Sequence, residues 1–417
     1  MADRNSSKDR NYHPDRKAQR DFPLRSPLCL CVSVVMVAIA IPLWAQQSRI
    51  YRDGNSWVEE ITGTLPPARE LHISTDLGSV QVQGNAPHIS YVIRKRSYAS
   101  NPEGAHRQFE QMRISAGKNI DGDSIEGRTK KKNLQHFAVD FVVQIPRDMN
   151  LVKVETRMGS LTFGSIAATI LATTGGGSIR LDDLAGPVKI SSGGGNVEAG
   201  NLGGNLSLTS GAADVHVNNV GGEMLVNLGG GRVNVGSTRA SFIQTGAGSI
   251  QVQKCFGDLH VTSGGGNLNL GDIDGAVQAE TDGGSVRLAS ARGPVTVKTG
   301  GGSVELYNLG RGAQVETGAG PITVEFVGTH GFADSFLHTA AGDVTVCFSS
   351  SLPVTVHATS DMASGHGIWS ELPGLNITKQ GGNMVPMSMS AEGALNGGGP
   401  ALRIRTTIGQ IAFRRCQ

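Results

Sequence analysis

Few side chains of this sequence have a type and spacing that could support catalysis. The acidic residues in the middle of the chain are scattered: Asp182, Asp183, Asp214, Asp258, Asp272, Asp274 and Asp282. A polysaccharide lyase or hydrolase needs carboxylates or bases gathered in a groove, and the repeated part of the chain has almost no aromatic rings to stack on sugars. Several of these acids stand at glycine-rich corners, where Asp is a common turn residue. The pattern predicts a protein that is not an enzyme, with a polysaccharide-active enzyme as a remote alternative.

Histidine and cysteine do not show the spacing of metal ligands. No HxH or HExxH pattern is formed by His216, His260, His330, His338, His357 and His366, and a surface or loop position is expected for each. Of the five cysteines, Cys29 and Cys31 lie in an apolar segment, and Cys255, Cys347 and Cys416 are widely spaced without a CxxC. We expect buried or free thiols with at most one disulfide. No catalytic, cofactor-binding or metal-binding residue and no cofactor is assigned.

The elements that position these side chains come from an internal repeat. Nine similar segments begin at Gly175, Gly193, Gly211, Gly229, Gly246, Gly264, Asp282, Gly300 and Gly318. Successive starts are 18 residues apart, with a single gap of 17 between Gly229 and Gly246. A related segment begins one period upstream at Arg157, and another follows at Ala340 after a short insertion. Repetition at a fixed period is the signature of a repeat architecture.

Within each unit, apolar and polar residues alternate. After the glycine corner, apolar residues stand at the fifth and seventh places, as in Ile179 and Leu181, and a second such pair follows nine places later. Alternation with a period of two predicts strands that bury one face. The eighteenth place is Ser or Thr in most units: Thr174, Ser192, Ser210, Thr245, Ser263, Thr281, Thr299 and Thr317. We expect these hydroxyls to stack in a column near the corner and to form structural hydrogen bonds.

Strand length then limits the fold. Two strands of about five residues and two glycine corners account for one turn of this period. The same residue types recur in the same register, which favours coils stacked in parallel over a stack of hairpins. The sequence predicts an all-β fold, a parallel β-solenoid (β-helix) of about ten 18-residue coils with irregular β caps at both ends. The half-period favours a flattened coil with two sheets. Because one coil cannot bury its own apolar face, its neighbours and the caps must stabilise it.

The N-terminal end of the chain has the layout of an export signal. Residues 1–27 mix basic and acidic side chains without periodicity and are expected to be disordered. Residues 28–45 are apolar, short for a full membrane span, and followed by polar residues from Gln46. Ala45 is a small residue of the kind that precedes a signal-peptidase cleavage site. Leu43, at the third place before that site, matches the usual small residue poorly. Two readings stay open: a signal peptide cleaved after Ala45, which gives a periplasmic or secreted protein, or a membrane anchor facing the periplasm or exterior.

The regions on either side of the repeat have the irregular patterns of caps. Residues 46–156 are expected to form an N-terminal irregular β region and cap, with strands near 71–75, 79–83, 89–95, 137–145 and 151–155. The piece Leu77–Val82 resembles half a repeat and is expected to join the solenoid. Residues 157–346 are the repeat, and 347–417 are expected to form a loop-rich segment and cap. Within the latter, 361–399 is expected to be a loop, and the pattern returns at Thr407–Phe413.

Charge and the repeat argue against two kinds of ligand. The formal net charge is +2, and the only basic clusters are residues 94–96 and 130–132, which we expect at solvated loop or strand ends. No nucleic-acid partner is therefore predicted. Calcium-binding β-rolls need an Asp at a fixed place of each half-turn. The corresponding sixth place holds Arg180, Glu198, His216, Asn234, Gln251, Asn269, Arg287, Glu305 and Thr323, so no column of calcium ligands is expected.

Three groups of residues carry a resemblance to a known family. They are the repeated G-G-G-S-V-x-V units, the G-S-V-Q-V of residues 78–82 and the T-I-G-Q-I-A-F of residues 407–413. Together they resemble the bacterial "putative adhesin" family, a domain of unknown function with a glycine-rich β-solenoid body. The resemblance covers about residues 57–417 and implies an extracytoplasmic β-solenoid. It brings no catalytic residues.

These observations predict a non-enzymatic, exported cell-envelope β-solenoid. Its first expected role is that of an adhesin, binding protein or structural scaffold for an unknown protein or glycan ligand. A second is an assembly module whose coils stack end to end, as open sheet edges do unless they are capped. A third is a sensor anchored in the membrane through residues 28–45.

Overall fold

The computed structural model describes residues 46–119, 122–130, 136–327, 331–349, 351–381 and 387–416. The leader 1–27 and the segment 28–45, with Cys29 and Cys31, lie outside the described residues, as do residues 131–132, His330 and the side chain of His366. Residues 43–417 make one compact unit. Across the described ranges, no helix combines the length and the apolar character that a bilayer crossing requires.

The repeat folds into ten consecutive pairs of strands, which are the twenty strands from β9 to β28. Their bounds are β9 Leu151–Thr156, β10 Leu161–Gly164, β11 Thr169–Thr174, β12 Ile179–Asp182, β13 Val188–Ser192, β14 Val197–Leu202, β15 Leu206–Ser210, β16 Val215–Val220, β17 Glu223–Leu228, β18 Val233–Thr238, β19 Ala240–Thr245, β20 Ile250–Cys255, β21 Leu259–Ser263, β22 Leu268–Ile273, β23 Val277–Thr281, β24 Val286–Ala291, β25 Val295–Thr299, β26 Val304–Leu309, β27 Ala313–Ala319 and β28 Ile322–Phe326.

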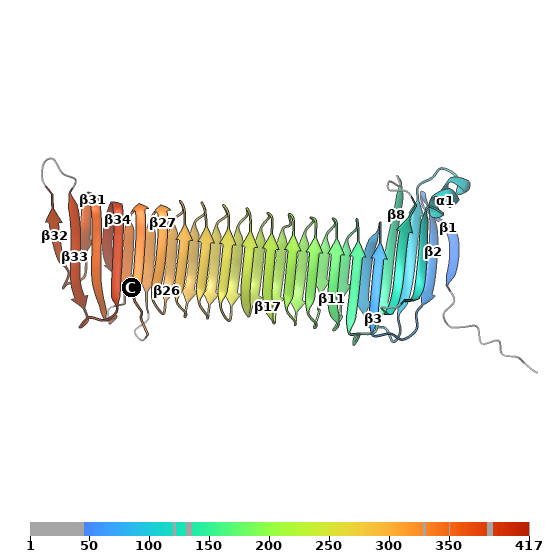
Figure 1. Cartoon of the computed structure of the whole chain (residues 1–417), viewed down its shortest axis with the longest axis horizontal. Helices are drawn as coiled ribbons and strands as arrows, with labels where there is room; N and C mark the ends of the chain where they lie inside the picture. The colour runs from blue at the N-terminus through green and yellow to red at the C-terminus, as the bar shows by residue number, and fades with distance from the viewer. Residues whose placement is uncertain are drawn as a thin grey trace, which may run out of the picture. The chain divides into compact units, whose positions relative to one another are not determined.

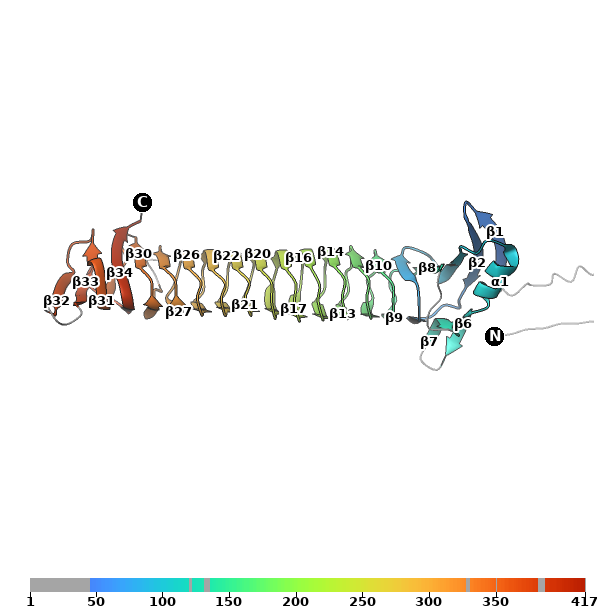
Figure 2. The ribbon, with the colours of Figure 1, turned by 90° about the horizontal axis from the view of Figure 1, so that it is seen from above.

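Every strand pairs in parallel with the equivalent strand of the next coil. Odd-numbered strands pair with odd-numbered ones, as β11 with β13, and even with even, as β12 with β14. The paired residues are one period apart: Ile170 faces Val188. We call the two sets of strands the odd row and the even row, and Figure 2 shows them on opposite sides of the coils. The predicted parallel solenoid and its flattened, two-sheet cross-section are therefore confirmed.

The inward places of both rows form one continuous core. The side chains at the fifth and seventh places are buried in the even row, as Val197 and Ala199 are, and so are those nine places later in the odd row, as Leu206 and Leu208 are. Burial of each Val, Leu or Ile side chain is worth about 1.5–3 kcal/mol relative to exposure. Because each coil contributes only a few such residues, the stack rather than the single coil supplies the stability.

The corner column of hydroxyls is also present. Thr281 Oγ1 donates a hydrogen bond to the carbonyl oxygen of Gly266 in the preceding coil, at 3.0 Å. Thr281 Oγ1 also accepts from the backbone N–H of Gly284 at 3.2 Å. Thr299 repeats both contacts one coil later. Most eighteenth-place residues thus satisfy backbone groups that a tight corner would otherwise leave unpaired, as predicted, whereas the buried Ser210 Oγ has no hydrogen-bond partner.

The single 17-residue gap is absorbed at one corner. Arg239 alone connects β18 to β19, at a corner where the preceding coil has Gly221-Gly222. Glu223 consequently pairs with Ala240, 17 residues away, and the register continues unchanged in β19 and β21. One residue fewer in a corner leaves the two faces of the strands aligned, whereas a deletion within a strand would turn its apolar residues outward.

The N-terminal part builds its cap by placing strands out of sequence order. Its elements are β1 Gln47–Asp53, β2 Ser56–Thr64, β3 Glu70–Thr75, β4 Ser79–Gly84, β5 Ser90–Ser97, α1 Pro102–Phe109, β6 Met112–Asn119, β7 Gly122–Thr129 and β8 Phe137–Ile145. Strand β3 lies between β7 and β9, and β4 lies between β8 and β10, with parallel pairing throughout. The predicted half-repeat therefore joins the solenoid. Antiparallel strands β5, β2 and β1 continue the sheet beyond β8 (Figure 1).

Two features of this cap differ from the sequence-based expectations. Helix α1 was not predicted; Pro102 lies at its start, and the Oδ1 of Asn101 accepts from the N–H of Gly104 at 2.7 Å. The basic run Arg94–Arg96 does not lie at a solvated strand end. It is inside β5, where Lys95 is only 5% exposed and its Nζ lies 2.9 Å from Glu59 Oε2. The carboxylates of the neighbouring strand account for the burial of this charge.

The C-terminal part also departs from chain order. After β29 Ser335–Ala341 and β30 Val344–Phe348 come β31 Val354–Ser370, β32 Asn376–Gln380, β33 Ser388–Leu395 and β34 Ala401–Arg415. Strand β34 pairs in parallel with β29 and β30 on one side and with β31 on the other. Strands β33 and β32 extend β31 as antiparallel neighbours. Residues 407–413 thus return to the repeat, as predicted.

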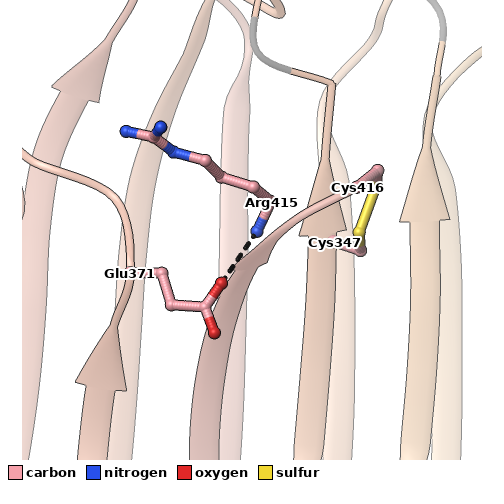
Figure 3. The surroundings of a disulfide bond; sticks show 4 residues. All are labelled: Cys347, Glu371, Arg415 and Cys416. Carbon is pink, nitrogen blue, oxygen red and sulfur yellow. Dashed lines mark hydrogen bonds between the residues drawn. A yellow bond between two sulfur atoms is a disulfide. The ribbon is translucent and has the colours of Figure 1, made fainter.

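The expectation of a loop over 361–399 is corrected by this arrangement. Strand β31 continues to Ser370, and β32 and β33 account for much of the remaining segment. The Gly, Ser and Met content conceals an alternation in β33, where Met389 and Ala391 are buried and the residues between them are less so. Cys347 and Cys416 form a disulfide between β30 and the end of β34 (Figure 3), and Cys255 is a buried free thiol. One disulfide agrees with the predicted upper limit.

Candidate binding groove

A groove of about 790 Å³ runs along the outer side of the odd row. It begins at β11 and ends at β25, and each of these eight strands contributes residues near its start. Eight neighbouring strands with a spacing of about 4.8 Å give the groove a length of about 34 Å. It therefore crosses many coils, and its chemistry is set by columns of equivalent residues.

Two columns border the groove. The first contains corner residues that precede the strands or, in β17 and β19, begin them: Pro187, Asn205, Glu223, Ala240, Asp258, Ala276 and Pro294. The second contains the first outward residue of each strand: Lys189, Ser207, Leu225, Phe242, His260, Gln278 and Thr296. Between these columns lie residues such as Leu206 and Met224, whose side chains are buried in the core. Parallel register brings the members of each column together although they are 17 or 18 residues apart in sequence.

The centre of the second column is apolar and exposed. Leu225 is 48% exposed and Phe242 is 39% exposed. The rings of Phe242 and His260 stack, with centroids 4.7 Å apart and an angle of 26° between their planes. A ring nitrogen of His260 lies 3.4 Å from Thr262 Oγ1, and this hydrogen bond also restrains the imidazole. Large apolar side chains at consecutive outward places are unusual here, because most outward residues of the repeat are polar.

Polar residues occupy both ends of the same column. Lys189 and Ser207 precede Leu225, and Gln278 and Thr296 follow His260. The groove thus has an apolar middle of three side chains with polar positions on either side along the stack.

The corner column is held by hydrogen bonds between coils. Asn205 Oδ1 accepts from the backbone N–H of Glu223 at 2.9 Å. Asp258 Oδ1 accepts from the N–H of Ala276 at 2.8 Å. Each bond joins a side chain to the next coil, so this border of the groove is fixed before any ligand arrives.

The scattered acids of the sequence do not come together at one site. Among them, only Asp258 borders the groove. Asp214 pairs with Arg232 at 2.8 Å, and the hydrogen bond from this guanidinium holds the pKa of Asp214 below its usual range. Asp272 accepts from Ser290 at 2.8 Å, and Asp274 pairs with Arg292 at 2.9 Å. These carboxylates serve contacts between neighbouring coils.

The histidines and the sixth-place residues are likewise dispersed. His260 lies in the groove, and His338 stacks with Phe336 further along the odd row. The sixth-place residues face outward from the even row, where Arg180 pairs with Glu198. No three His, Cys, Asp or Glu side chains gather as metal ligands in the part of the chain that the structure describes.

The sequence analysis did not identify the groove, although the sequence contains a signal for it. When the units are aligned with the 17-residue gap included, Leu225 and Phe242 occupy equivalent outward places that hold Lys189 and Ser207 in the two preceding coils. Two large apolar residues at a solvent-facing place mark an exposed patch. The concave border could not be derived, because it depends on how far each corner projects.

Comparison with known proteins finds similar solved structures but no matching sequence family. No family model and no curated protein matches the chain. A "putative cell adhesion protein" from Clostridium sporogenes has 9% identity and a TM-score of 0.18, and covers 86% of this chain and 100% of its own. Structures titled "putative adhesin" from Bacteroides fragilis and Parabacteroides distasonis have 14% and 12% identity and TM-scores of 0.20 and 0.22. Each covers 70% of this chain and 96% of its own. The latter two titles use the words of the family name that the repeat motifs resemble.

Proposed function

We propose that this protein is a non-enzymatic, exported cell-envelope solenoid that binds an extended polypeptide segment in the groove of the odd row. The observation that carries the proposal is the exposed apolar centre formed by Leu225, Phe242 and His260 between polar ends. Protein-binding surfaces commonly combine an apolar, aromatic-containing centre with a polar rim. The restrained His260 ring and the hydrogen-bonded corner column reduce the ordering that binding requires.

The stacked rings favour a polypeptide over a glycan. Phe242 and His260 face each other across neighbouring coils, so one face of each ring is covered. A sugar ring could stack only on the remaining face of each ring, whereas aliphatic side chains pack against ring edges as well. A glycan is therefore the competing ligand class that the test below must distinguish.

The disulfide supports action outside the cytoplasm. Cys347 and Cys416 are bonded, and disulfides persist mainly in oxidising compartments. The apolar segment 28–45 supplies a route for export, either as a cleaved signal peptide or as an anchor. An anchor would place the groove at the cell envelope, and cleavage after Ala45 would release the solenoid into the periplasm or medium.

The caps favour binding along the side over stacking end to end. At one end, β1 and β2 extend the sheet in antiparallel fashion beyond the parallel coils. At the other end, the outer strand β32 has five residues and carries Lys379. Short, charged and antiparallel edges discourage pairing with another sheet. An assembly module of stacked coils is accordingly the alternative with less support.

The proposed function is tested by screening the full-length protein for ligands. The purified protein would be screened against a phage-displayed random-peptide library and against a glycan array. We expect enrichment of peptides that share apolar residues, and we expect Phe242→Ser to weaken their binding at least tenfold, because the variant removes the aromatic centre. Affinity would be measured by titration calorimetry.

Phe256→Ser is the matched control. Phe256 is also an exposed phenylalanine, at 54%, but it does not line the groove. Its loss should leave peptide binding unchanged. Equal loss in both variants, or enrichment of glycans without peptides, would contradict the proposed function.

A further inference from the structure

The last strand of the chain occupies a place that its sequence position does not require. Strand β34 lies between β29–β30 and β31, so it separates two coils that are consecutive in the chain. We call the space that β34 fills the closing slot. Both sides of the slot are strand edges that pair in parallel with β34, and Figure 1 shows β34 among these strands.

The slot and the strand depend on each other. Leu402, Ile411 and Phe413 of β34 are fully buried, and the ring of Phe413 stacks on that of Phe348 at 6.2 Å between centroids. Without β34, the inward side chains and the pairing edges of the slot would be open to water. The removed strand would expose its own apolar residues. The closing slot is therefore matched to a strand with the sequence of β34, and β34 is matched to a slot with these edges.

Chain order makes the slot open at some stage of folding. Strands β31 to β33 precede β34 in the chain, and β31 stands one place beyond the slot. Because β31 precedes β34 in the chain, the outer side of the slot is synthesised before the strand that fills it. Pairing between distant segments is slow compared with local structure. An unfilled slot can accept the β34 of any copy that reaches it first.

The connection to β34 permits such an exchange. Residues 396–400 read Asn-Gly-Gly-Gly-Pro, and Gly397 and Gly398 have φ angles of 88° and 78°. Five residues can extend to about 17 Å, which is enough to carry a strand across to an adjoining molecule. Exchange of an identical element between copies preserves every contact of the closed form, and this is why it is a low-cost route to dimers.

The disulfide joins β34 to one side of the closing slot. Cys416 follows β34 directly, and Cys347 lies in β30, on one side of the slot (Figure 3). Near it, the backbone N–H of Arg415 donates to Glu371 at 3.3 Å. We propose that β34 is an exchangeable strand whose alternative acceptor is the closing slot of a second copy of this chain, with the Cys347–Cys416 bond as the latch. This inference goes beyond the proposed function and does not depend on the groove.

The latch opens and closes by a balanced thiol exchange. A dithiol reductant gives two electrons and two protons to the disulfide and itself closes to a cyclic disulfide. Both cysteines are then thiols, and β34 is held by non-covalent contacts alone. Oxidised glutathione reverses the step: it accepts two electrons and two protons and leaves as two thiols.

A complementation experiment tests the exchange. Full-length Cys347→Ser and Cys416→Ser chains are mixed, reduced with dithiothreitol, and reoxidised with oxidised glutathione. Neither chain can close its own latch, but exchange places Cys416 of the first chain beside Cys347 of the second. We expect a covalent heterodimer whose linked peptides, identified by mass spectrometry, are those of residues 347 and 416. Each chain oxidised alone gives the background of random dimers.

Hydrogen exchange distinguishes strand exchange from a chance link between frayed ends. In the heterodimer, the amides of residues 402–413 should be as protected as in the oxidised wild-type monomer. Reduced wild-type chain should form dimers in sedimentation that increase with protein concentration. The inference is overturned if heterodimers do not exceed the background or if the linked chains have unprotected β34 amides. It is also overturned if the reduced wild-type chain stays monomeric at all protein concentrations.

Discussion

At the scale of single residues, the corners decide whether coils can stack. At the third place of the corner, which is glycine in all nine units except that of Ala213, a side chain would meet the backbone of the preceding coil. A Cβ placed on Gly284 would lie 2.0 Å from the carbonyl oxygen of Gly266, and one on Gly302 would lie 1.9 Å from that of Gly284. The second glycine of the same corner, Gly283, would meet nothing within 4 Å. Adjacent glycines of one motif thus have different physical roles.

This difference predicts a contrast between two alanine variants. Gly284→Ala must push apart two coils whose backbones are in contact, and we expect it to destabilise the solenoid by about 1–3 kcal/mol, the usual cost of overpacking. Gly283→Ala should change stability by no more than about 0.5 kcal/mol, as for other exposed positions. Urea unfolding followed by circular dichroism checks both. Similar midpoints for the two variants would contradict the stacking geometry.

Much of the residue-level structure could be predicted from the sequence. The inward places, the glycine corners and the hydroxyl column all follow from the periodicity, because each coil repeats the environment of its neighbours. The exposed pair Leu225 and Phe242 broke the polar pattern and was overlooked. A departure from a repeat is visible only when the units are aligned residue by residue.

At the scale of elements, the caps differ from the repeat in how they are stabilised. In the N-terminal cap, Glu60 of β2 accepts hydrogen bonds from Arg94 Nε at 2.8 Å and from an Arg49 nitrogen at 2.6 Å. Glu60 is 5% exposed, and these guanidinium groups join β1, β2 and β5 through one carboxylate. The hydrogen bond from Arg94, and then that from Arg49, lower the pKa of Glu60 although burial opposes them.

A lowered pKa makes the cap sensitive to acid. Because the folded pKa of Glu60 lies below its unfolded value, its contribution is present above the unfolded pKa and is lost as pH falls through the folded pKa. We expect Glu60→Gln to cost about 1–3 kcal/mol at pH 7. Its urea midpoint should also fall less than that of the wild type between about pH 7 and pH 3.

Tryptophan fluorescence measures this effect within the cap. Trp57 lies in β2, three residues before Glu60, and Trp44 and Trp369 would be replaced by Phe in all chains to isolate its signal. Glu70→Gln, at an exposed position of β3, is the control and should behave as the parent chain does. An unchanged acid response in Glu60→Gln would contradict the role given to the network.

The order of the caps could not be predicted from the sequence. Alternation identified the strands near 71–75, 79–83 and 137–145, but it does not state which strands are neighbours. Strands β3–β4 and β34 are inserted between strands from which they are distant in the chain. Such pairings depend on long-range packing, and the repeat rule that each coil follows its predecessor fails at both ends.

At the scale of the whole unit, the proposed function depends on stacking rather than on any one motif. The groove exists because parallel register aligns Leu225, Phe242 and His260 from three successive coils. The absence of clustered acids in the sequence led to the expectation of a non-enzymatic protein, and the ion pairs of Asp214 and Asp274 give these residues structural roles. A surface built from columns suits an extended ligand.

The measurement that tests this account most directly is photo-crosslinking in the cell that makes the protein. Phe242 would be replaced by the photoreactive residue benzoylphenylalanine, with the same replacement at Phe256 as the control. The account predicts a light-dependent adduct with a second protein at position 242, absent at position 256 and lost when Leu225→Asp is added. Equal adducts at both positions, or no protein adduct at position 242, would contradict it.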